Sequence, residues 1–137
     1  MLSVVVPIFN EEENIPAFHA ALEAALERIP DLCEVIYVND GSRDSSLELL
    51  LDIQRQYPQV TVVELSRNFG HQPALTAGMA AAQGEAVVLM DGDFQDPPEV
   101  LPRLFEAWRD GAKVVIAQRR AVLRVEFAES CFRFSTN

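Results

Sequence analysis

The sequence predicts an α/β fold with a mostly parallel sheet and flanking helices. Short runs rich in β-branched residues alternate with segments whose apolar positions recur every three or four residues. One of these runs, at residues 86–90, is apolar throughout, which is typical of a strand buried on both faces of a parallel sheet. Strands that alternate with helices are joined by right-handed crossovers and lie parallel.

The first strand and helix are expected at residues 4–6 and 15–29. The strand is a run of three valines that stops at Pro7. The helix has apolar residues at three- and four-residue spacing. Asn14 can cap its start, and Pro30 follows its end.

The second strand and helix are expected at residues 34–38 and 47–54. The strand ends at the polar turn of residues 39–42, whose sequence is Asn-Asp-Gly-Ser. Leucines at helical spacing follow the turn, so that Ser42 or Asp44 can cap the helix.

The third strand is expected at residues 60–65, and the loop of residues 66–72 leads from it into a helix of small residues at 73–82. That helix ends near Gly84, and the apolar strand at residues 86–90 follows it.

A last helix and strand are expected after the acidic segment of residues 91–96. Pro97 and Pro98 start the helix, and Gly111 ends it. Residues 113–117 are a candidate for the fifth strand.

Composition and charge exclude several classes of protein. With 137 residues, of which 49% are hydrophobic and 23% charged, the chain suits one globular domain. A net charge of −10 argues against nucleic-acid binding, because phosphate backbones require clustered lysines and arginines. Cys33 and Cys131 form no CxxC motif, so we expect free thiols. The N-terminus does not have the pattern of a signal peptide, and no apolar run is long enough to span a membrane.

Almost every unusual polar group follows a predicted strand. These clusters are Asn10-Glu11, Asn39-Asp40, Arg67-Asn68 and Asp91-Gly92-Asp93. The carboxyl ends of parallel strands share one edge of the sheet, and ligands of such sheets bind there. The sequence therefore predicts a binding site at this edge.

The segment of residues 91–96 is a candidate metal site. It places three carboxylates and one amide oxygen within six residues, which suits a hard cation such as Mg²⁺ or Mn²⁺. Gly92 would let the backbone approach a bulky ligand. An acidic turn that caps the following helix is the alternative. An EF-hand is excluded, because Asp96 and Pro102 stand where that loop needs Gly and Glu.

Other polar residues leave two interpretations open. Asp40 can accept a ring N–H of uracil or of guanine, or it can serve only the turn. The acidic residues 11–13 also suit a solvated first helical turn. His71 is a surface hydrogen-bonding group or, less simply, a general base. Arg119 and Arg120 can neutralise a diphosphate or lie exposed in solvent.

Two phosphate-binding signatures are absent from the sequence. No Walker A loop is present, and no G-x-G-x-x-G follows the first strand. P-loop and dinucleotide-binding folds therefore lose their main support. A metal ion at Asp93 is the remaining means of holding phosphates.

Together these motifs resemble the inverting family-two glycosyltransferases, which have the glycosyltransferase A fold. The matching motifs are Val-Val-Val-Pro-Ile-Phe-Asn-Glu at residues 4–11, Val-Asn-Asp-Gly-Ser at 38–42, Ser-Arg-Asn-Phe-Gly-His-Gln at 66–72 and Asp-Gly-Asp-Phe-Gln-Asp-Pro-Pro-Glu at 91–99. The Gln-Asp-Pro-Pro extension of the D-x-D motif resembles the polyprenyl-phosphate branch, which includes dolichol-phosphate mannose synthases and undecaprenyl-phosphate glucosyltransferases.

The resemblance implies a nucleotide site and a metal site. Asp93 and Gln95 would hold Mg²⁺ or Mn²⁺ on the diphosphate, and Asp93 and Arg119 would act in catalysis. Asp40 would bind the base, and Asp91 would contact the nucleoside. The residues that the resemblance assigns to nucleotide binding are Pro7, Phe9, Glu11, Asp40, Gly70 and Asp91.

The resemblance also implies the reaction and its partners. A sugar, with a UDP-sugar favoured as donor, would be transferred by direct displacement to a polyprenyl phosphate at the inner, cytoplasmic face of the cell membrane. The lipid phosphate is already ionised near neutral pH, so no strong general base is required. A polysaccharide acceptor is an alternative. The oligomeric state is left open.

The chain is expected to divide into two parts. Residues 1–120 form the nucleotide-sugar-binding domain, and residues 121–137 form a basic, amphipathic and incomplete tail. From residue 119 onward, four arginines stand against two glutamates. Members of the branch normally continue into interfacial or membrane helices, so we expect the chain to be truncated. A remnant that binds a nucleotide sugar without turnover is the second hypothesis.

Overall fold

The computed structural model describes residues 1–93, 95, 97–111, 114–119, 124–128 and 131–136, the last three ranges as backbone elements only. The chain consists of two compact units, Met1–Pro98 and Glu99–Asn137. Each unit is described by itself. The predicted division into a nucleotide-sugar-binding domain at residues 1–120 and a tail at 121–137 stays a prediction.

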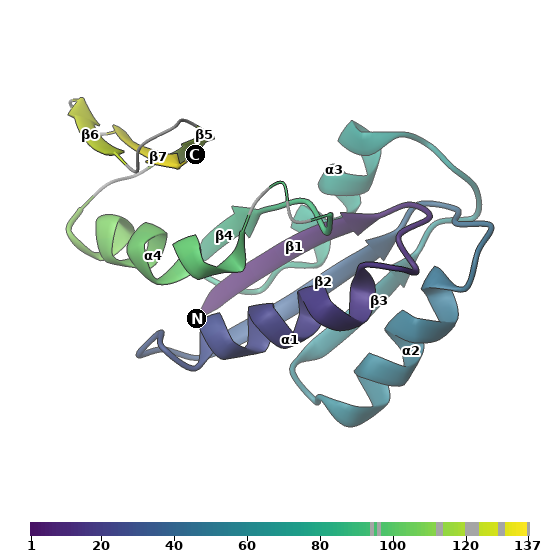
Figure 1. Cartoon of the computed structure of the whole chain (residues 1–137). Coiled ribbons are helices and arrows are strands. Elements are labelled where there is room, and N and C mark those ends of the chain that lie inside the picture. Colours follow the sequence, from purple (N-terminus) through teal and green to yellow (C-terminus); the bar gives the residue numbers. More distant parts are fainter. Residues whose placement is uncertain (94, 96, 112–113, 120–123, 129–130, 137) are drawn as a thin grey trace. The chain divides into compact units, whose positions relative to one another are not determined.

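The first unit is built on a four-stranded parallel sheet (Figure 1). Its strands are β1 (Leu2–Ile8), β2 (Cys33–Asn39), β3 (Val60–Glu64) and β4 (Ala86–Leu89). The strand order is β3-β2-β1-β4, so β1 and β2 form the centre of the sheet. All three pairings are parallel, which confirms the predicted α/β fold.

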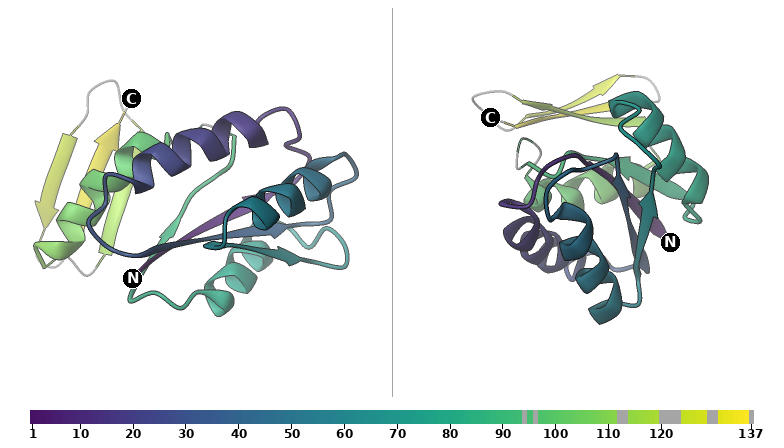
Figure 2. Two further views of the ribbon diagram at one scale, coloured as in Figure 1. Left: turned by 90° about the horizontal axis from the view of Figure 1, so that it is seen from below. Right: turned by 90° about the vertical axis from the view of Figure 1, so that its right-hand side faces the viewer.

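Helices cover both faces of this sheet (Figure 2). They are α1 (Ile15–Leu26), α2 (Ser46–Gln56) and α3 (His71–Ala81). The chain moves outward from β1 to β3 and then returns to β4 on the far side of β1. Because each crossover is right-handed, α1 and α2 lie on one face and α3 on the other. Every strand-to-helix loop therefore leaves the sheet at the same edge.

The core of the first unit lies on either side of the two central strands. On one face, Val5, Ile36 and Val38 are buried against Ala74 and Leu75 of α3. On the other face, the inward side of α1 contributes buried apolar side chains. These include Ile15, Phe18, Leu22 and Leu26. This burial fixes the direction of β1 and β2, whose carboxyl ends carry the polar clusters.

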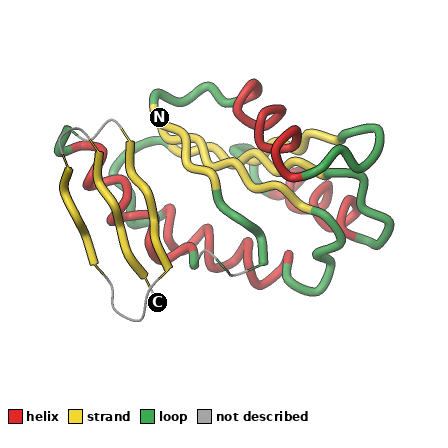
Figure 3. Tube along the Cα trace, turned by 90° about the horizontal axis from the view of Figure 1, so that it is seen from above, coloured by secondary structure: helices red, strands yellow, loops and turns green. Residues whose placement is uncertain are grey.

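The second unit contains a helix and a separate three-stranded sheet. After a short 3₁₀ turn, η1 (Pro98–Val100), helix α4 (Leu101–Arg109) leads to β5 (Val114–Arg119), β6 (Arg124–Ala128) and β7 (Cys131–Thr136). The strand order is β5-β7-β6, with β5 parallel and β6 antiparallel to β7. These are the yellow strands beside the C-terminus in Figure 3.

The predicted helix caps differ from those in the structure. Asn14 stands at the start of α1 but makes no capping bond, because its amide donates instead to Glu11 Oε2 at 2.7 Å. Ser45, not Ser42 or Asp44, precedes α2, although Asp44 Oδ1 accepts the N–H of Ser46 at 2.9 Å.

One expectation about the strands was wrong. Strand β4 is not buried on both faces, because it lies at the edge of the described sheet and leaves Val87 and Leu89 41% and 43% exposed. A run of apolar residues predicts a strand, but it does not predict whether other strands pair with that strand on both sides. The candidate fifth strand is confirmed as β5, which pairs with β7. Of the cysteines, Cys33 is a half-buried free thiol, and the side chain of Cys131 is outside the description. No helix in the described ranges has the length and apolar character needed to cross a bilayer.

A buried polar cluster connects α1 to β2. The ring of His19 is 4% exposed, and its Nδ1 lies 2.7 Å from the Tyr37 hydroxyl. Its Nε2 lies 3.4 Å from Glu23 Oε1, and the ring stacks edge-on against Tyr57. Gln59 donates to the same Glu23 carboxylate at 3.1 Å. Burial lowers the pKa of His19 from 6.5 to about 4 and raises the pKa of Glu23.

We expect His19 to make the fold sensitive to acid. The unfolded chain binds a proton at His19 near pH 6.5, whereas the folded chain resists it down to about pH 4. Stability is therefore full above pH 6.5 and falls as the pH falls toward 4, by at most about 3 kcal/mol. Urea unfolding at several pH values should show this slope in the parent chain and a shallower slope in His19→Gln.

Comparing the parent chain with His19→Gln separates the pH dependence due to His19 from that of the other titratable groups. The raised pKa of Glu23 acts in the opposite direction and is common to both chains. Glutamine retains a partner for the Tyr37 hydroxyl and carries no titratable group. Parallel pH profiles of unfolding free energy in the parent and in His19→Gln would contradict the assignment.

Candidate functional site

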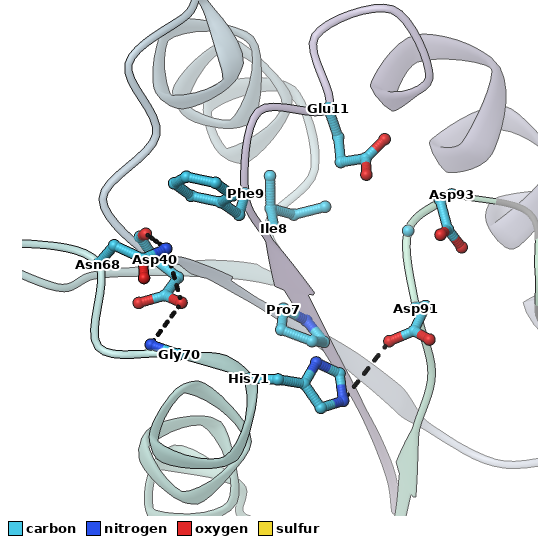
Figure 4. A pocket seen from close by; sticks show the side chains of 11 residues that line it. Pro7, Ile8, Phe9, Glu11, Asp40, Asn68, Gly70, His71, Asp91 and Asp93 are labelled. Carbon is cyan, nitrogen blue, oxygen red and sulfur yellow. Dashed lines mark hydrogen bonds and ion pairs between the residues drawn. The ribbon is translucent and has the colours of Figure 1, made fainter.

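A pocket opens at the edge of the first sheet where the strands end (Figure 4). Its volume is about 350 Å³. The ends of β1, β2 and β4 and the loop between β3 and α3 supply its walls. The lining residues are Pro7, Ile8, Phe9, Glu11, Asp40, Asn68, Gly70, His71, Asp91, Gly92 and Asp93.

The pocket contains most of the residues that the sequence singled out. Those that line it are Pro7, Phe9, Glu11, Asp40, Gly70, Asp91 and Asp93. Gln95 is not a lining residue, and its side chain is exposed. Arg119 is the last residue of β5 and belongs to the second unit. Asp96 and Arg120 lie outside the described residues. The individual roles of all these residues stay predictions.

Asp40 is buried at the carboxyl end of β2 and holds the loop that follows β3. Its Oδ1 accepts the N–H of Phe69 at 2.8 Å, and its Oδ2 accepts the N–H of Gly70 at 3.1 Å. The Asn68 amide donates to the same Oδ2 at 3.3 Å and to the Asp40 carbonyl at 3.1 Å. A buried carboxylate needs such donors, because an unsatisfied one is costly. Asp40 therefore stabilises the loop after β3 as well as its own turn.

Two glycines permit close contacts around Asp40 and β4. Gly41 has φ +71°, and a Cβ there would lie 2.3 Å from the backbone nitrogen of Asn68. Only glycine lets the two loops meet in this way. At Gly92, a Cβ would lie 2.6 Å from Cδ1 of Ile8. Gly92 thus lets the chain after β4 pack closely against the Ile8 side chain. The sequence suggested that this glycine makes room for a ligand.

The loop after β1 is bonded to the loop after β2 by a set of hydrogen bonds that we call the clasp. Ser42 Oγ accepts the N–H of Asn10 at 3.0 Å, and Asn10 Oδ1 accepts the N–H of Arg43 at 2.8 Å. Ser46 Oγ accepts the N–H of Glu11 at 2.9 Å. Asp44 and Glu12 exchange further bonds across the loops. In these, Glu12 N donates to Asp44 Oδ2 at 3.2 Å and Ser45 N donates to Glu12 Oε2 at 2.9 Å.

The clasp fixes the β1 side of the pocket. Asn10 has φ 52°, a left-handed conformation that asparagine tolerates better than most residues. Its neighbours Phe9 and Glu11 both line the pocket. Burial alone would raise the pKa of Asp44, but hydrogen bonds from the Ser46 hydroxyl and from the N–H groups of Ser46 and Glu12 lower it below its ordinary value. The Asp44 carboxylate therefore stays charged and continues to accept those bonds.

The opposite wall of the pocket carries two carboxylates and an imidazole. Asp91 and Asp93 follow β4, and His71 is the first residue of α3. The Nε2 atom of His71 lies 3.8 Å from Oδ1 of Asp91, and Figure 4 shows the ring turned toward that carboxylate. Asp93 Oδ1 accepts the N–H of Gln95 at 3.0 Å. Together with Glu11 and Asp40, the pocket contains four carboxylates.

The donor set suits one mode of metal binding. In the described part of the chain, no three His, Cys, Asp or Glu side chains are grouped as a preformed metal site. Mg²⁺ and Mn²⁺ are commonly held by one or two carboxylates together with substrate phosphates and water. Asp91 and Asp93, which both line the pocket, fit that mode. Gln95 contributes its N–H to Asp93, and its role as a metal ligand stays a prediction.

The sequence did not identify every lining residue. The predicted first strand stops at Pro7 and so leaves out Ile8, which is the last residue of β1, and Asn68 is only one member of a polar cluster. His71 was interpreted mainly as a surface group, since a single loop histidine has no pattern. Its signal was the position directly after Gly70, because residues that begin a helix after a parallel strand face the binding edge.

Comparison with known proteins gives a consistent result. Residues 3–129 match the family model described as glycosyl transferase family 2. The bactoprenol glucosyl transferase of Shigella phage SfV is 43% identical over 118 residues, which are 86% of this chain and 38% of that protein.

Two solved structures have a similar fold. S. aureus TarS 1–349 in complex with UDP-GlcNAc has a TM-score of 0.68 and 24% identity, over 94% of this chain and 37% of that one. The mannosyltransferase PcManGT from Pyrobaculum calidifontis, in complex with GDP-Man and Mn²⁺, has a TM-score of 0.67 and 24% identity, over 87% of this chain and 35% of that one. The expected glycosyltransferase A fold is confirmed. This chain spans less than two fifths of the length of each of these proteins.

The clasp can be tested at Asn10. Asn10→Gly keeps the left-handed backbone but removes the acceptor for the Arg43 N–H, whereas Asn10→Asp keeps an acceptor. We expect amide hydrogen exchange at Arg43 to become about fivefold faster in Asn10→Gly, since a net hydrogen bond contributes about 1 kcal/mol. Exchange in Asn10→Asp should stay near that of the parent. Equal exchange at Arg43 in all three chains would show that the side-chain bond is not formed in solution.

Proposed function

We propose that this chain, which belongs to glycosyl transferase family 2, holds the nucleotide-sugar site of an enzyme that transfers a sugar from a UDP-sugar to a polyprenyl phosphate. The observation that carries the proposal is the pocket at the strand ends, which combines the buried Asp40 with Asp91 and Asp93. The family is one of glycosyltransferases. The donor, the metal and the acceptor are inferred separately below.

The hydrogen bonds of Asp40 favour uracil as the base. A carboxylate oxygen has two acceptor positions. Oδ2 already accepts from Gly70 and Asn68, whereas Oδ1 accepts only from Phe69 among the described residues. One position therefore remains, on Oδ1. Uracil presents a single ring N–H, but guanine presents a ring N–H and an adjacent amino group that together need both oxygens. TarS is in complex with UDP-GlcNAc and the equally similar PcManGT with GDP-Man, so the choice of uracil is based on the acceptor position of Asp40 alone.

A divalent cation is proposed to accompany the nucleotide. Four carboxylates line the pocket, and they repel a diphosphate unless a cation lies between them. Asp93 would hold Mg²⁺ or Mn²⁺, which would neutralise the charge of the departing nucleoside diphosphate. Asp91, which the family resemblance assigns to the nucleoside, is proposed as the second carboxylate at the metal in place of Gln95, because Asp91 lines the pocket and Gln95 does not. The Mn²⁺ in the PcManGT complex supports a divalent metal. Arg119 is kept as a proposed phosphate contact on the strength of the family resemblance alone.

The acceptor is proposed from the relatives. The phage protein, at 43% identity, is named as a bactoprenol glucosyl transferase, and bactoprenol is a polyprenyl lipid. A lipid phosphate oxygen is ionised near neutral pH, so it can attack the anomeric carbon without a strong general base. We place the reaction at the cytoplasmic face of the membrane, where the basic segment after residue 118 would meet anionic lipid.

Binding of UDP should require the metal. Calorimetry of the chain with UDP and Mn²⁺ should show binding, whereas UDP in EDTA should bind at least tenfold more weakly, because the carboxylates then face the phosphates uncompensated. GDP with Mn²⁺ should bind more weakly than UDP, because Asp40 has one acceptor position left. Equal affinity for UDP with Mn²⁺ and in EDTA would remove the metal from the proposal.

Asp93→Asn and Glu13→Gln provide a matched pair of variants for this measurement. Each removes one carboxylate charge, but Glu13 is exposed and does not line the pocket. Only Asp93→Asn should weaken the Mn²⁺-dependent binding of UDP. A loss of similar size in Glu13→Gln would mean that total charge, and not a ligand at Asp93, governs the affinity.

Membrane association should depend on the basic segment. We expect the chain to pellet with phosphatidylglycerol vesicles and the double variant Arg124→Glu with Arg133→Glu to pellet less, since each basic group near an anionic surface contributes about 1 kcal/mol. Arg28→Glu with Arg55→Glu makes the same charge change on exposed residues of the first unit. Equal pelleting of both double variants would exclude a specific role for the segment.

A further inference from the structure

His71 has a position in the pocket that neither of its expected roles explains. It is the first residue of α3 and lines the pocket, and 56% of its side chain is exposed. Its ring points across the pocket toward Asp91 (Figure 4). The separation of 3.8 Å between Nε2 and Oδ1 is too long for a hydrogen bond. Nε2 therefore has an ion-pair contact with Asp91 but no hydrogen bond to it, and the ring lines the pocket where a ligand would bind.

The other lining side chains offer no comparable donor. Pro7, Ile8 and Phe9 are apolar, and the four carboxylates can only accept hydrogen bonds when ionised. The amide of Asn68 donates to Asp40. Among the described residues that line the pocket, His71 thus carries the one side-chain N–H that is not directed at Asp40. Imidazole has such a donor in its neutral and in its charged form.

The backbone just before α3 is also occupied. The start of a helix commonly binds anions through unpaired N–H groups. Here the N–H groups of Phe69 and Gly70, which precede α3, donate to Asp40. These two N–H groups are therefore not available to an anion in this part of the pocket.

A nucleoside diphosphate brings oxygens that act only as acceptors. We propose that His71 donates a ring N–H to a phosphate oxygen of the bound nucleotide, which makes it a contact of the substrate and not a surface group. The inference rests on the proposed function, because it assumes a nucleotide in this pocket. Asp91 is the positioning residue that turns the ring toward the ligand.

This role differs from that of a general base. A base would act on the acceptor and would leave the affinity for UDP unchanged. A phosphate contact changes the affinity for UDP and spares uridine, which has no phosphate. The two roles therefore separate in binding measurements made without any acceptor.

The experiment measures binding of UDP and of uridine to the full chain in Mn²⁺, by calorimetry and by NMR titration. His71→Ala should bind UDP about tenfold more weakly than the parent, because a charge-assisted hydrogen bond is lost, and should bind uridine equally well. His71→Gln, which retains an N–H donor, should recover part of the loss. Gln72→Ala, an exposed neighbour outside the lining, should match the parent with both ligands.

Each of three other outcomes would overturn the inference, and each indicates a different explanation. Unchanged UDP affinity in His71→Ala would leave His71 a surface group or a base. An equal loss for UDP and uridine would mean that the substitution distorts the pocket. A parent chain that binds neither UDP nor GDP in Mn²⁺ would refute the proposed function itself, and the role of His71 with it.

Discussion

The buried carboxylate of Asp40 is the group on which the rest of the pocket depends. Its bonds to the N–H groups of Phe69 and Gly70 join the end of β2 to the loop after β3. A buried carboxylate without donors costs free energy, so these bonds stabilise the Asp40 side chain and the loop that donates them. Gly70 also precedes α3, so the same bonds determine where that helix begins and where His71 stands.

The pocket combines groups that oppose one another until a ligand is bound. Four carboxylates converge where the strands end, and parallel strands leave them no other edge. A divalent cation offsets part of that charge and lets a diphosphate lie beside carboxylates that would otherwise repel it. The acidity that argues against nucleic acid as a partner is thus compatible with a small nucleotide that arrives with a metal.

The sequence predicted the parts of the fold that depend on local patterns. Strand and helix order followed from apolar spacing, and the binding edge followed from polar residues such as Asp40 and Asp93 directly after strands. The absence of a capping bond at Asn14 could not be predicted, because its side-chain amide donates to Glu11 instead of capping α1. The exposure of Leu89 depends on which strand lies beside β4, and no pattern within β4 contains that information.

The clasp has a consequence for how this sequence can vary. Each of the bonds between its two loops is donated by a main-chain N–H and accepted by a side-chain oxygen. The chemical constraint therefore falls on the acceptors, among them Asn10, Ser42 and Ser46. Arg43 and Ser45 contribute only backbone to it. The clasp therefore does not constrain the side chains at these two exposed positions, and they can change the surface beside the pocket while the loops stay joined.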